Sequence, residues 1–233
     1  MELKISNKER KTIIKVHDWL NDFFKESYKK GETGRAHGLD HIHRVTGIAT
    51  QIALLEGHKP FLTVITALLF DLGRMGGDPR SQDSRHGQVS VEMTKDLLDS
   101  LDQLSEEDKR LIKNAMEDHS KHKEEIRQNY LVQIIIDSSL IENFGAIGVL
   151  SAAAHRHNLP LYAKEISTSR EDEEIKTIYQ DIVFRQNISP EQFYTDSARK
   201  LVLSRRKFRN IYIKQLENEL FFSQGTYNKL MEE

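Results

Sequence analysis

Apolar residues recur every three or four positions along most of the chain, which is the spacing of one face of an α-helix. Ile13, Val16 and Leu20 show this spacing near the N-terminus. No segment alternates convincingly between apolar and polar residues, so the pattern predicts no strand. It predicts helices near residues 7–29, between Gly38 and Gly57, from Pro60 to Leu72, and near 86–101 and 106–122, then a buried helix pair over 129–157 and a long amphipathic helix over about 191–222.

Residues that commonly start or stop helices support these boundaries. Gly57 suits a helix C-terminus, and Pro60 suits the first turn of the helix that follows. Ser105 and the acidic residues after it are typical of a helix start. The boundaries therefore have local chemical causes as well as the apolar period.

No internal repeat and no long linker divides the chain. Residues 73–85 form a polar loop rich in glycine, and residues 165–175 form a charged surface segment. We therefore expect one all-α domain over residues 1–233, with a core near 30–160 and a C-terminal helical extension over about 176–233.

The composition narrows the class of protein. The 233 residues include 34 Lys and Arg against 36 Asp and Glu, a net charge of −2, so the chain carries no basic nucleic-acid footprint. Cysteine is absent, which excludes disulfides, thiolate metal sites and cysteine nucleophiles. The longest strongly apolar stretch, Phe61–Phe70, is half of the roughly twenty residues that a membrane span needs. Since the N-terminus lacks a signal-peptide pattern, we expect a cytoplasmic protein with no membrane segment.

Histidines and one aspartate form the candidate chemistry of the chain. Ten histidines are present, and His37 and His41 are four residues apart, so they share a face on a helix. Asp71 closes an apolar helix beside the glycine-rich loop, where a carboxylate does nothing for helix formation. Neutral imidazole and carboxylate are together a ligand set for Zn, Mn, Fe, Ni or Mg. The other candidate histidines stand at predicted helix ends: His86, His119 and His122.

Four segments resemble motifs of HD-domain phosphohydrolases. The segment His37–Val45 resembles their opening motif, and Ala67–Gly73 resembles the second motif, in which an apolar helix ends in Leu-His-Asp. Residues 131–148 resemble the segment that normally reads Asp-Ala-Asp-Arg-Leu-Asp-Ala-Ile-Gly-Ala-Ile-Gly, and residues 196–217 resemble the closing helix of one bacterial branch. The resemblance implies an HD-domain helical bundle with a long C-terminal helical extension.

The resemblance also implies a metal site, from which this chain departs at two positions. The family's site uses a first histidine, a His-Asp pair and a distal aspartate. The first histidine corresponds to His41 and the aspartate of the pair to Asp71, but the histidine of the pair corresponds to Phe70. The distal aspartate corresponds to Ser139. Asp137 lies two residues earlier, about 200° around a helix, so we do not expect it to replace the missing ligand.

Candidate roles follow from the resemblance. His41 and Asp71 would bind a divalent ion, with His86 and His119 filling the gap that Phe70 leaves. In two-metal members of the family, histidines from the two helices after the HD motif bind a second ion. An arginine in the pocket would offset charge that develops on a phosphate. The expected catalytic residues are Asp71, Arg74 and His119. The expected further pocket residues are His37, Arg44, His122, Asp137 and Ser139.

Three functions are open on this basis. The first is a metal-dependent phosphohydrolase that acts on a nucleotide or a related phosphoester, for which Mn, Mg, Ni, Zn or Fe would serve. The second is a catalytically degenerate relative that binds a nucleotide or a protein partner without turnover and needs no metal, a hypothesis motivated by Phe70 and Ser139. The third is a helical scaffold that forms a homodimer through the apolar stripe of the C-terminal helix.

Overall fold

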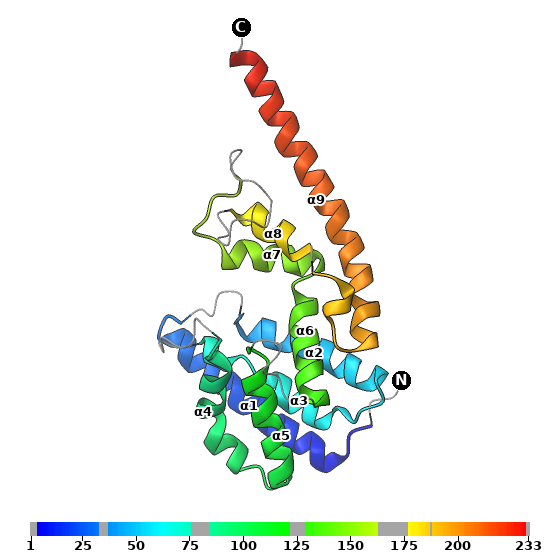
Figure 1. Ribbon diagram of the computed structural model, residues 1–233. Coiled ribbons are helices and arrows are strands. Elements are labelled where there is room, and N and C mark those ends of the chain that lie inside the picture. Colours follow the sequence, from blue (N-terminus) through cyan, green and yellow to red (C-terminus); the bar gives the residue numbers. More distant parts are fainter. Residues whose placement is uncertain are drawn as a thin grey trace. The chain divides into compact units, whose positions relative to one another are not determined.

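The protein is all-α, as the sequence predicts (Figure 1). The computed structural model describes residues 4–32, 37–75, 84–121, 129–162, 177–186 and 188–231, and no strand occurs among them. In chain order its elements are α1 (Asn7–Lys29), α2 (Leu39–Leu55), α3 (Pro60–Leu69), the 3-10 turn η2 (Leu72–Arg74), α4 (His86–Asp99), α5 (Glu106–Asp118), α6 (Tyr130–Glu142), α7 (Gly145–His155), α8 (Ile178–Gln186), the 3-10 turn η5 (Pro190–Gln192) and α9 (Asp196–Met231).

Local signals place several helix boundaries where the sequence predicts them. Ser6 and Ser105 cap α1 and α5, and each forms a reciprocal capping box with the acidic residue three positions later. Pro60 is the first residue of α3, where its missing amide hydrogen costs nothing. Gly57 follows α2 with a φ of 77°, a backbone conformation that glycine adopts without strain.

The C-terminal helix differs from the prediction at both ends. It begins at Asp196 rather than near residue 191, because Pro190–Gln192 forms a 3-10 turn and the hydroxyl of Thr195 then caps the first α-helical turn. It continues as far as Met231. Even so, no single helix among the described residues is both long and apolar enough to cross a membrane, and only the consecutive helices α6 and α7 would together reach that threshold.

Contacts within the chain group it into two compact units. Unit 1 comprises Met1–Glu142 with Phe193–Arg199, and unit 2 comprises Asn143–Gln192 with Lys200–Glu233. The sequence pattern does not predict this division, because the apolar stretch over 129–157 continues across the boundary. All of the candidate site residues belong to unit 1.

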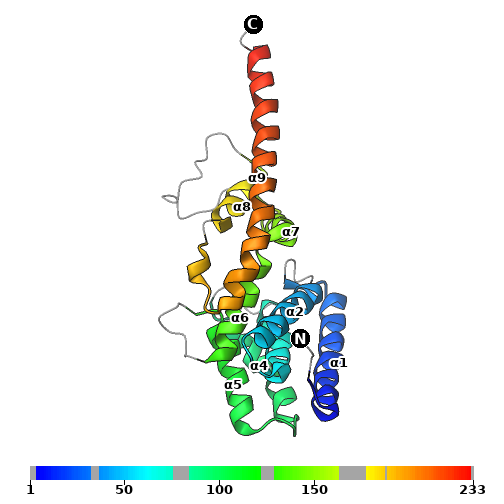
Figure 2. The same ribbon diagram turned by 90° about the vertical axis from the view of Figure 1, so that its right-hand side faces the viewer.

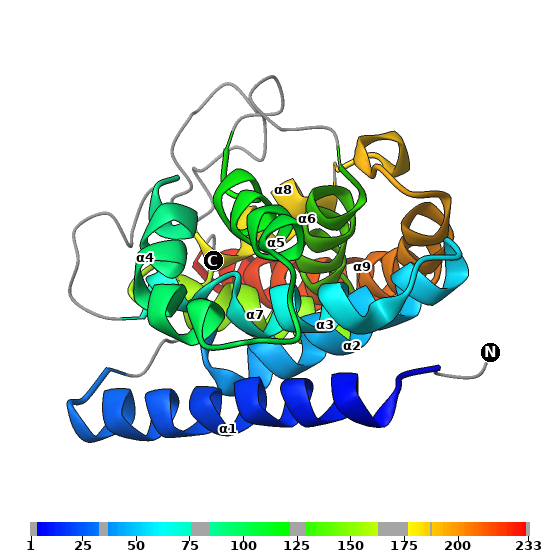
Figure 3. The same ribbon diagram turned by 90° about the horizontal axis from the view of Figure 1, so that it is seen from below.

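Unit 1 is built around α3, whose residues from Thr63 to Leu69 are all buried. This helix contacts α1, α2, α5 and α6, while α4 packs on α5 and on η2. Figure 3 shows α1 running along one side of this bundle. A helix that is apolar on every side is stable only when neighbours surround it. Because α3 is enclosed, the residues at its C-terminal end, Phe70 and Asp71, lie inside the unit.

Unit 2 contains α7, α8 and the part of α9 that follows Arg199, which Figure 2 shows side by side. Arg209 of α9 is fully buried, with its guanidinium 5.5 Å from the ring centroid of Phe144 and its Nη1 donating to the Asn143 carbonyl at 3.0 Å. On α9, Phe208 and Ile211 are exposed, and dimerisation through the apolar stripe of this helix stays a prediction. The apolar core of the unit consists of Val149, Ala152, Tyr179, Ile182 and Ile213.

Candidate functional site

The position of Asp71 depends on a close approach between η2 and α4. Asp71 follows α3 and precedes Gly73, whose backbone lies so near α4 that a Cβ there would be 2.1 Å from the carbonyl oxygen of His86. The Gly73 amide donates a hydrogen bond to the buried hydroxyl of Ser90 at 2.8 Å. Only glycine permits this contact, which brings the Asp71 carboxylate against the first turn of α4.

A second glycine contact brings α4 and α5 together. A Cβ on Gly87 would be 2.3 Å from the carbonyl oxygen of Met116, so the two helices approach closely at this point. As a result, the Nε2 atoms of His86 and His119 are only 3.0 Å apart. His119 Nδ1 donates to the Met116 carbonyl at 2.6 Å, which leaves the Nε2 lone pair of a neutral His119 facing the site.

The Asp71 carboxylate lies between two pairs of imidazoles. Its Oδ2 is 2.6 Å from His37 Nδ1 and 3.4 Å from His41 Nε2. Its Oδ1 is 3.4 Å from His86 Nε2 and 3.7 Å from His119 Nε2. The Asp71 side chain is only 4% exposed. One buried carboxylate therefore faces nitrogen donors on both of its oxygens.

On the side away from Asp71, a series of charged groups fixes His41. Its Nδ1 is 2.5 Å from Glu142 Oε2, and Arg44 Nε donates to the other oxygen of Glu142 at 2.5 Å. Arg44 Nη1 in turn donates to Asp40 at 2.6 Å. His41 Nε2 is buried and has no hydrogen-bond partner. An imidazole with one nitrogen fixed by a carboxylate and the other directed into a site is the usual arrangement of a metal-binding histidine.

The protonation equilibria show that the site favours positive charge. Burial disfavours a charged imidazole, yet the carboxylates of Asp71 and Glu142 outweigh it and raise the pKa of His41 to about 9. Burial also opposes ionisation of Asp71, but His37, His119 and His41 hold the pKa of Asp71 well below its usual value. Burial likewise opposes ionisation of Glu142, where His41 and Arg44 lower the pKa. Two ionised carboxylates thus meet at His41, where a proton or a metal ion balances their charge.

The site opens on a cavity of about 430 Å³. Phe70 is fully buried, and its ring centroid lies 4.9 Å from that of His119 and 6.1 Å from that of His41. Phe70 therefore packs against two imidazoles of the site and offers no metal ligand. The residues that line the cavity are His37, Asp71, Arg74, Ser84, His86, His119, Ser120 and Ser139.

The remaining predicted pocket residues have different positions. Arg44 contacts Glu142 rather than the cavity, and His122 lies outside the described residues. Asp137 points at the segment before α9, where it accepts hydrogen bonds from the amide of Tyr194 at 2.9 Å and from the amide and hydroxyl of Thr195 at 2.8 and 2.7 Å. Asp137 thus ties this segment to α6 and does not line the cavity.

Glu142 is the site residue that sequence analysis does not assign. It ends α6 and is 4% exposed, and it contacts both His41 and Arg44. The signal was present, because Glu142 occupies an acidic position of the segment 131–148 that resembles the family motif. What the sequence lacks is the distance between Glu142 and His41, which are 101 positions apart.

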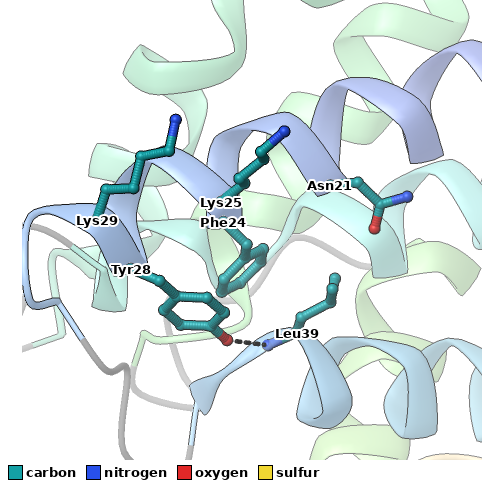
Figure 4. A pocket seen from close by; sticks show the side chains of 6 residues that line it. All are labelled: Asn21, Phe24, Lys25, Tyr28, Lys29 and Leu39. Carbon is teal, nitrogen blue, oxygen red and sulfur yellow. Dashed lines mark hydrogen bonds between the residues drawn. The ribbon is translucent and has the colours of Figure 1, made fainter.

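A second cavity of about 500 Å³ lies between α1 and the start of α2 (Figure 4). Its wall includes Phe24, Leu39 and the ring of Tyr28, whose hydroxyl accepts a hydrogen bond from the Leu39 amide at 3.3 Å. None of its lining residues is a histidine or a carboxylate. Of these two cavities, only the one at Asp71 is lined by histidine and carboxylate side chains.

The donor atoms at Asp71 fit a metal ion. Two groups of three have all of their ligand atoms within 4.8 Å of one another: His37, His41 and Asp71, and Asp71, His86 and His119. Metal bonds of about 2.1 Å at angles between 90° and 110° place neighbouring ligand atoms about 3.0–3.4 Å apart. The separations of 3.0, 3.4 and 3.7 Å among Asp71, His86 and His119 lie close to that range. Four imidazoles with one carboxylate favour a transition-metal ion over Mg²⁺, which prefers oxygen ligands.

Comparison with known proteins places the chain in a family. A family model described as HD domain matches residues 38–185. No curated protein matches the sequence. Among solved structures, YpgQ of Bacillus subtilis in complex with ADP is 19% identical and superposes with a TM-score of 0.66, covering 91% of this chain and 96% of its own.

Two further solved structures are similar over nearly their whole length. A protein from Lactobacillus plantarum is 16% identical with a TM-score of 0.66, and the match covers 93% of this chain and 99% of that one. An HD-superfamily hydrolase from Bacillus thuringiensis is 16% identical with a TM-score of 0.64, and the match covers 91% of this chain and 98% of that one. At these identities the likeness shows a shared fold.

Proposed function

The chain belongs to the HD-domain family and has the fold of HD-superfamily hydrolases, and on that premise we propose that it hydrolyses a phosphoester of a nucleotide or a related compound with a divalent metal ion. The observation that carries the proposal is the buried Asp71 carboxylate, which faces imidazole nitrogens on both oxygens and lines a cavity of about 430 Å³. A site of this size suits a small-molecule substrate.

The residues of the cavity have complementary roles in the proposed reaction. Asp71, His86 and His119 would hold the ion, with His41 on the other oxygen of the same carboxylate. A bound divalent ion lowers the pKa of a coordinated water and polarises a phosphoryl oxygen. Arg74 lines the same cavity, and a guanidinium binds phosphate oxygens and offsets the charge that they gain in the reaction.

The nucleotide class rests on two observations. A structural relative, YpgQ, was solved in complex with ADP, and the match covers 91% of this chain. Within this chain, the hydroxyl-bearing side chains of Ser84, Ser120 and Ser139 line the cavity together with Arg74, so donors for phosphate oxygens lie beside the metal ligands. Together they favour a phosphorylated substrate over an uncharged one.

Hydrolysis of a nucleotide panel tests the proposal. Protein stripped with a chelator should be inactive, and Mn²⁺ or Co²⁺ should restore release of phosphate or pyrophosphate. Asp71→Asn should abolish turnover, whereas Asp99→Asn, which changes an exposed acid beside Lys113, should leave it unchanged. Full turnover in excess chelator, or in Asp71→Asn, would contradict the proposal.

A second candidate function is nucleotide binding without turnover. Its support is that Phe70 and Ser139 cannot supply the two ligands that the family site has at these positions. Under this alternative, ADP would raise the melting temperature of the protein in a thermal melt, while the hydrolysis assay above would detect no turnover. Turnover that the Asp71→Asn variant loses would exclude it.

A further inference from the structure

We propose that His37 supplies the metal ligand that Phe70 cannot, so that the site holds two ions, one at each oxygen of Asp71. This inference rests on the metal site of the proposed function, and adds to it a ligand and a second ion. The arrangement is particular to this chain, because Phe70 occupies the position at which the family motif has a histidine before the aspartate.

The Oδ1 side of Asp71 is complete without His41. Its three donor atoms, from Asp71, His86 and His119, are separated by 3.0, 3.4 and 3.7 Å. Three protein ligands with one open position are sufficient for a catalytic ion, and this group lines the cavity, where a water or substrate can take that position. One ion therefore needs neither the histidine missing at Phe70 nor His41.

His41 is then left with a directed but unpartnered nitrogen on the Oδ2 side. Its Nδ1 is occupied by Glu142, so the Nε2 of a neutral ring presents a lone pair to Asp71 Oδ2 at 3.4 Å. A lone pair and a carboxylate oxygen buried at that distance repel each other unless a cation lies between them, which is a proton in the metal-free site and would be the metal ion in the loaded one. Two ligands hold an ion weakly, so a second ion on this side needs one more donor.

His37 is placed to be that donor. It precedes α2 and is four residues from His41, and the two ring centroids are 5.2 Å apart. Its Nδ1 is 2.6 Å from Asp71 Oδ2, so a shift of a few tenths of an ångström would convert this contact into a ligand separation of about 3.0 Å. The His37 side chain is 28% exposed, whereas those of His41 and His86 are 5% and 6% exposed. His37 is therefore the least enclosed of these three imidazoles.

Phe70 explains why the ligand must come from elsewhere. Its buried ring packs against both His41 and His119, with centroid distances of 6.1 and 4.9 Å. The ring thus contacts one imidazole of each pair and offers a lone pair to neither. A histidine introduced at position 70 would face the same two residues, which makes this position the natural site for a rescue variant.

Ion content per chain tests the proposal directly. Full-length protein is equilibrated with Co²⁺ by dialysis, and bound cobalt is counted by elemental analysis alongside the visible spectrum of the bound ion. We expect two ions in the wild type and one in His37→Gln, which retains a polar side chain near Asp71 but is a poor ligand. His86→Ala should also bind one ion. The matched control is His43→Ala, in the same segment but stacked on His17 at 5.4 Å, which should bind two.

A rescue variant and three contrary outcomes complete the test. Adding Phe70→His to His37→Gln should restore the second ion, a result that a merely structural role of His37 does not produce. Two ions in a folded His37→Gln would overturn the proposal, with folding checked by the thermal transition. A wild type that binds one ion, lost in His86→Ala and retained in His37→Gln, would overturn it while leaving the proposed hydrolase intact. A wild type without any bound ion would contradict both the two-ion proposal and the proposed metal-dependent hydrolase.

Discussion

Unit 1 buries two aspartates in segments that resemble HD motifs, Asp71 after α3 and Asp137 within α6, and their surroundings differ in kind. Asp71 faces four imidazole nitrogens, and those neighbours hold its pKa well below the usual value. Asp137 accepts three hydrogen bonds from Tyr194 and Thr195, yet burial outweighs these bonds and raises its pKa. One aspartate is surrounded by groups that can exchange a proton for a metal ion, and the other by two backbone amides and a threonine hydroxyl.

The comparison shows that burial of an acid does not by itself mark a functional site. Backbone amides keep their protons at all ordinary pH values, so Asp137 has permanent partners and acts as a structural clamp. An imidazole that gives up its proton presents a lone pair to a metal ion. Asp71 can therefore pair with a protonated imidazole or with a metal ion, as a metal-binding carboxylate must. Of the two aspartates, Asp71 is the one that lines the cavity of about 430 Å³.

The largest expected effect comes from removing the charge of Asp71. Asp71→Asn keeps the size of the side chain but removes the carboxylate shared by both groups of imidazoles. We expect turnover to fall by roughly 10³-fold or more, about 4 kcal/mol, while the protein stays folded. Steady-state hydrolysis and a thermal melt of the same variant check this. An unfolded variant would instead show that Asp71, like Asp137, stabilises the fold.

Changing Asp137 should have the opposite outcome. Asp137→Ala leaves the amides of Tyr194 and Thr195 without their acceptor inside the unit. The free energy of unfolding should fall by roughly 3–5 kcal/mol, since each buried donor that loses its partner costs about 1–3 kcal/mol. Urea denaturation measures this loss. Metal content per folded chain should be unchanged, and a loss of metal at unchanged stability would contradict the structural role.

The pH dependence of stability in metal-free protein gives a third test. The pKa of His41 is raised from 6.5 to about 9 in the folded protein, so protonated His41 stabilises the fold. This contribution is fully present below pH 6.5 and is lost as the pH rises through about 9, a loss of roughly 3 kcal/mol at most. His41→Gln should flatten the decline, measured by urea denaturation between pH 6 and pH 9.5. Co²⁺ should remove it as well, because the ion takes the place of the proton.

The smallest expected effect belongs to Glu142, which acts through His41. Glu142→Gln leaves a side chain that can still bond to His41 Nδ1 but removes the negative charge that stabilises it. Loss of such an indirect partner typically lowers metal affinity by about 10–100-fold. Competition with a metal indicator measures the change, and Glu107→Gln on the outer face of α5 is the matched control. Equal affinities in the two variants would remove Glu142 from the site.

The predictions that depend on neighbouring residues agree with the structure. The start of α5 after Ser105 and the start of α3 at Pro60 are set by a few adjacent side chains, so the local sequence contains their causes. The sequence also singles out His41 and Asp71, because a carboxylate at the end of an apolar helix has no local explanation.

Features of the site that depend on how helices pack are not predicted by the local sequence. Asp137 and Glu142 both lie on α6, and which of them faces the site depends on how that helix is rotated against α2 and against the segment 193–199. The contact of Asp71 with His86 depends on the absence of a Cβ at Gly73. Neither the rotation of α6 nor the approach at Gly73 is encoded in a pattern of neighbouring residues. The roles of Glu142 and Asp137 therefore follow only from the structure.

Ion content of the wild type and of Asp71→Asn, measured side by side after dialysis against Co²⁺, tests the central claim most directly. The account predicts two bound ions in the wild type and loss of both in the variant, since the carboxylate contributes to each group of ligands. Equal ion content in the two proteins would contradict the claim that this protein is a metal-dependent hydrolase centred on Asp71.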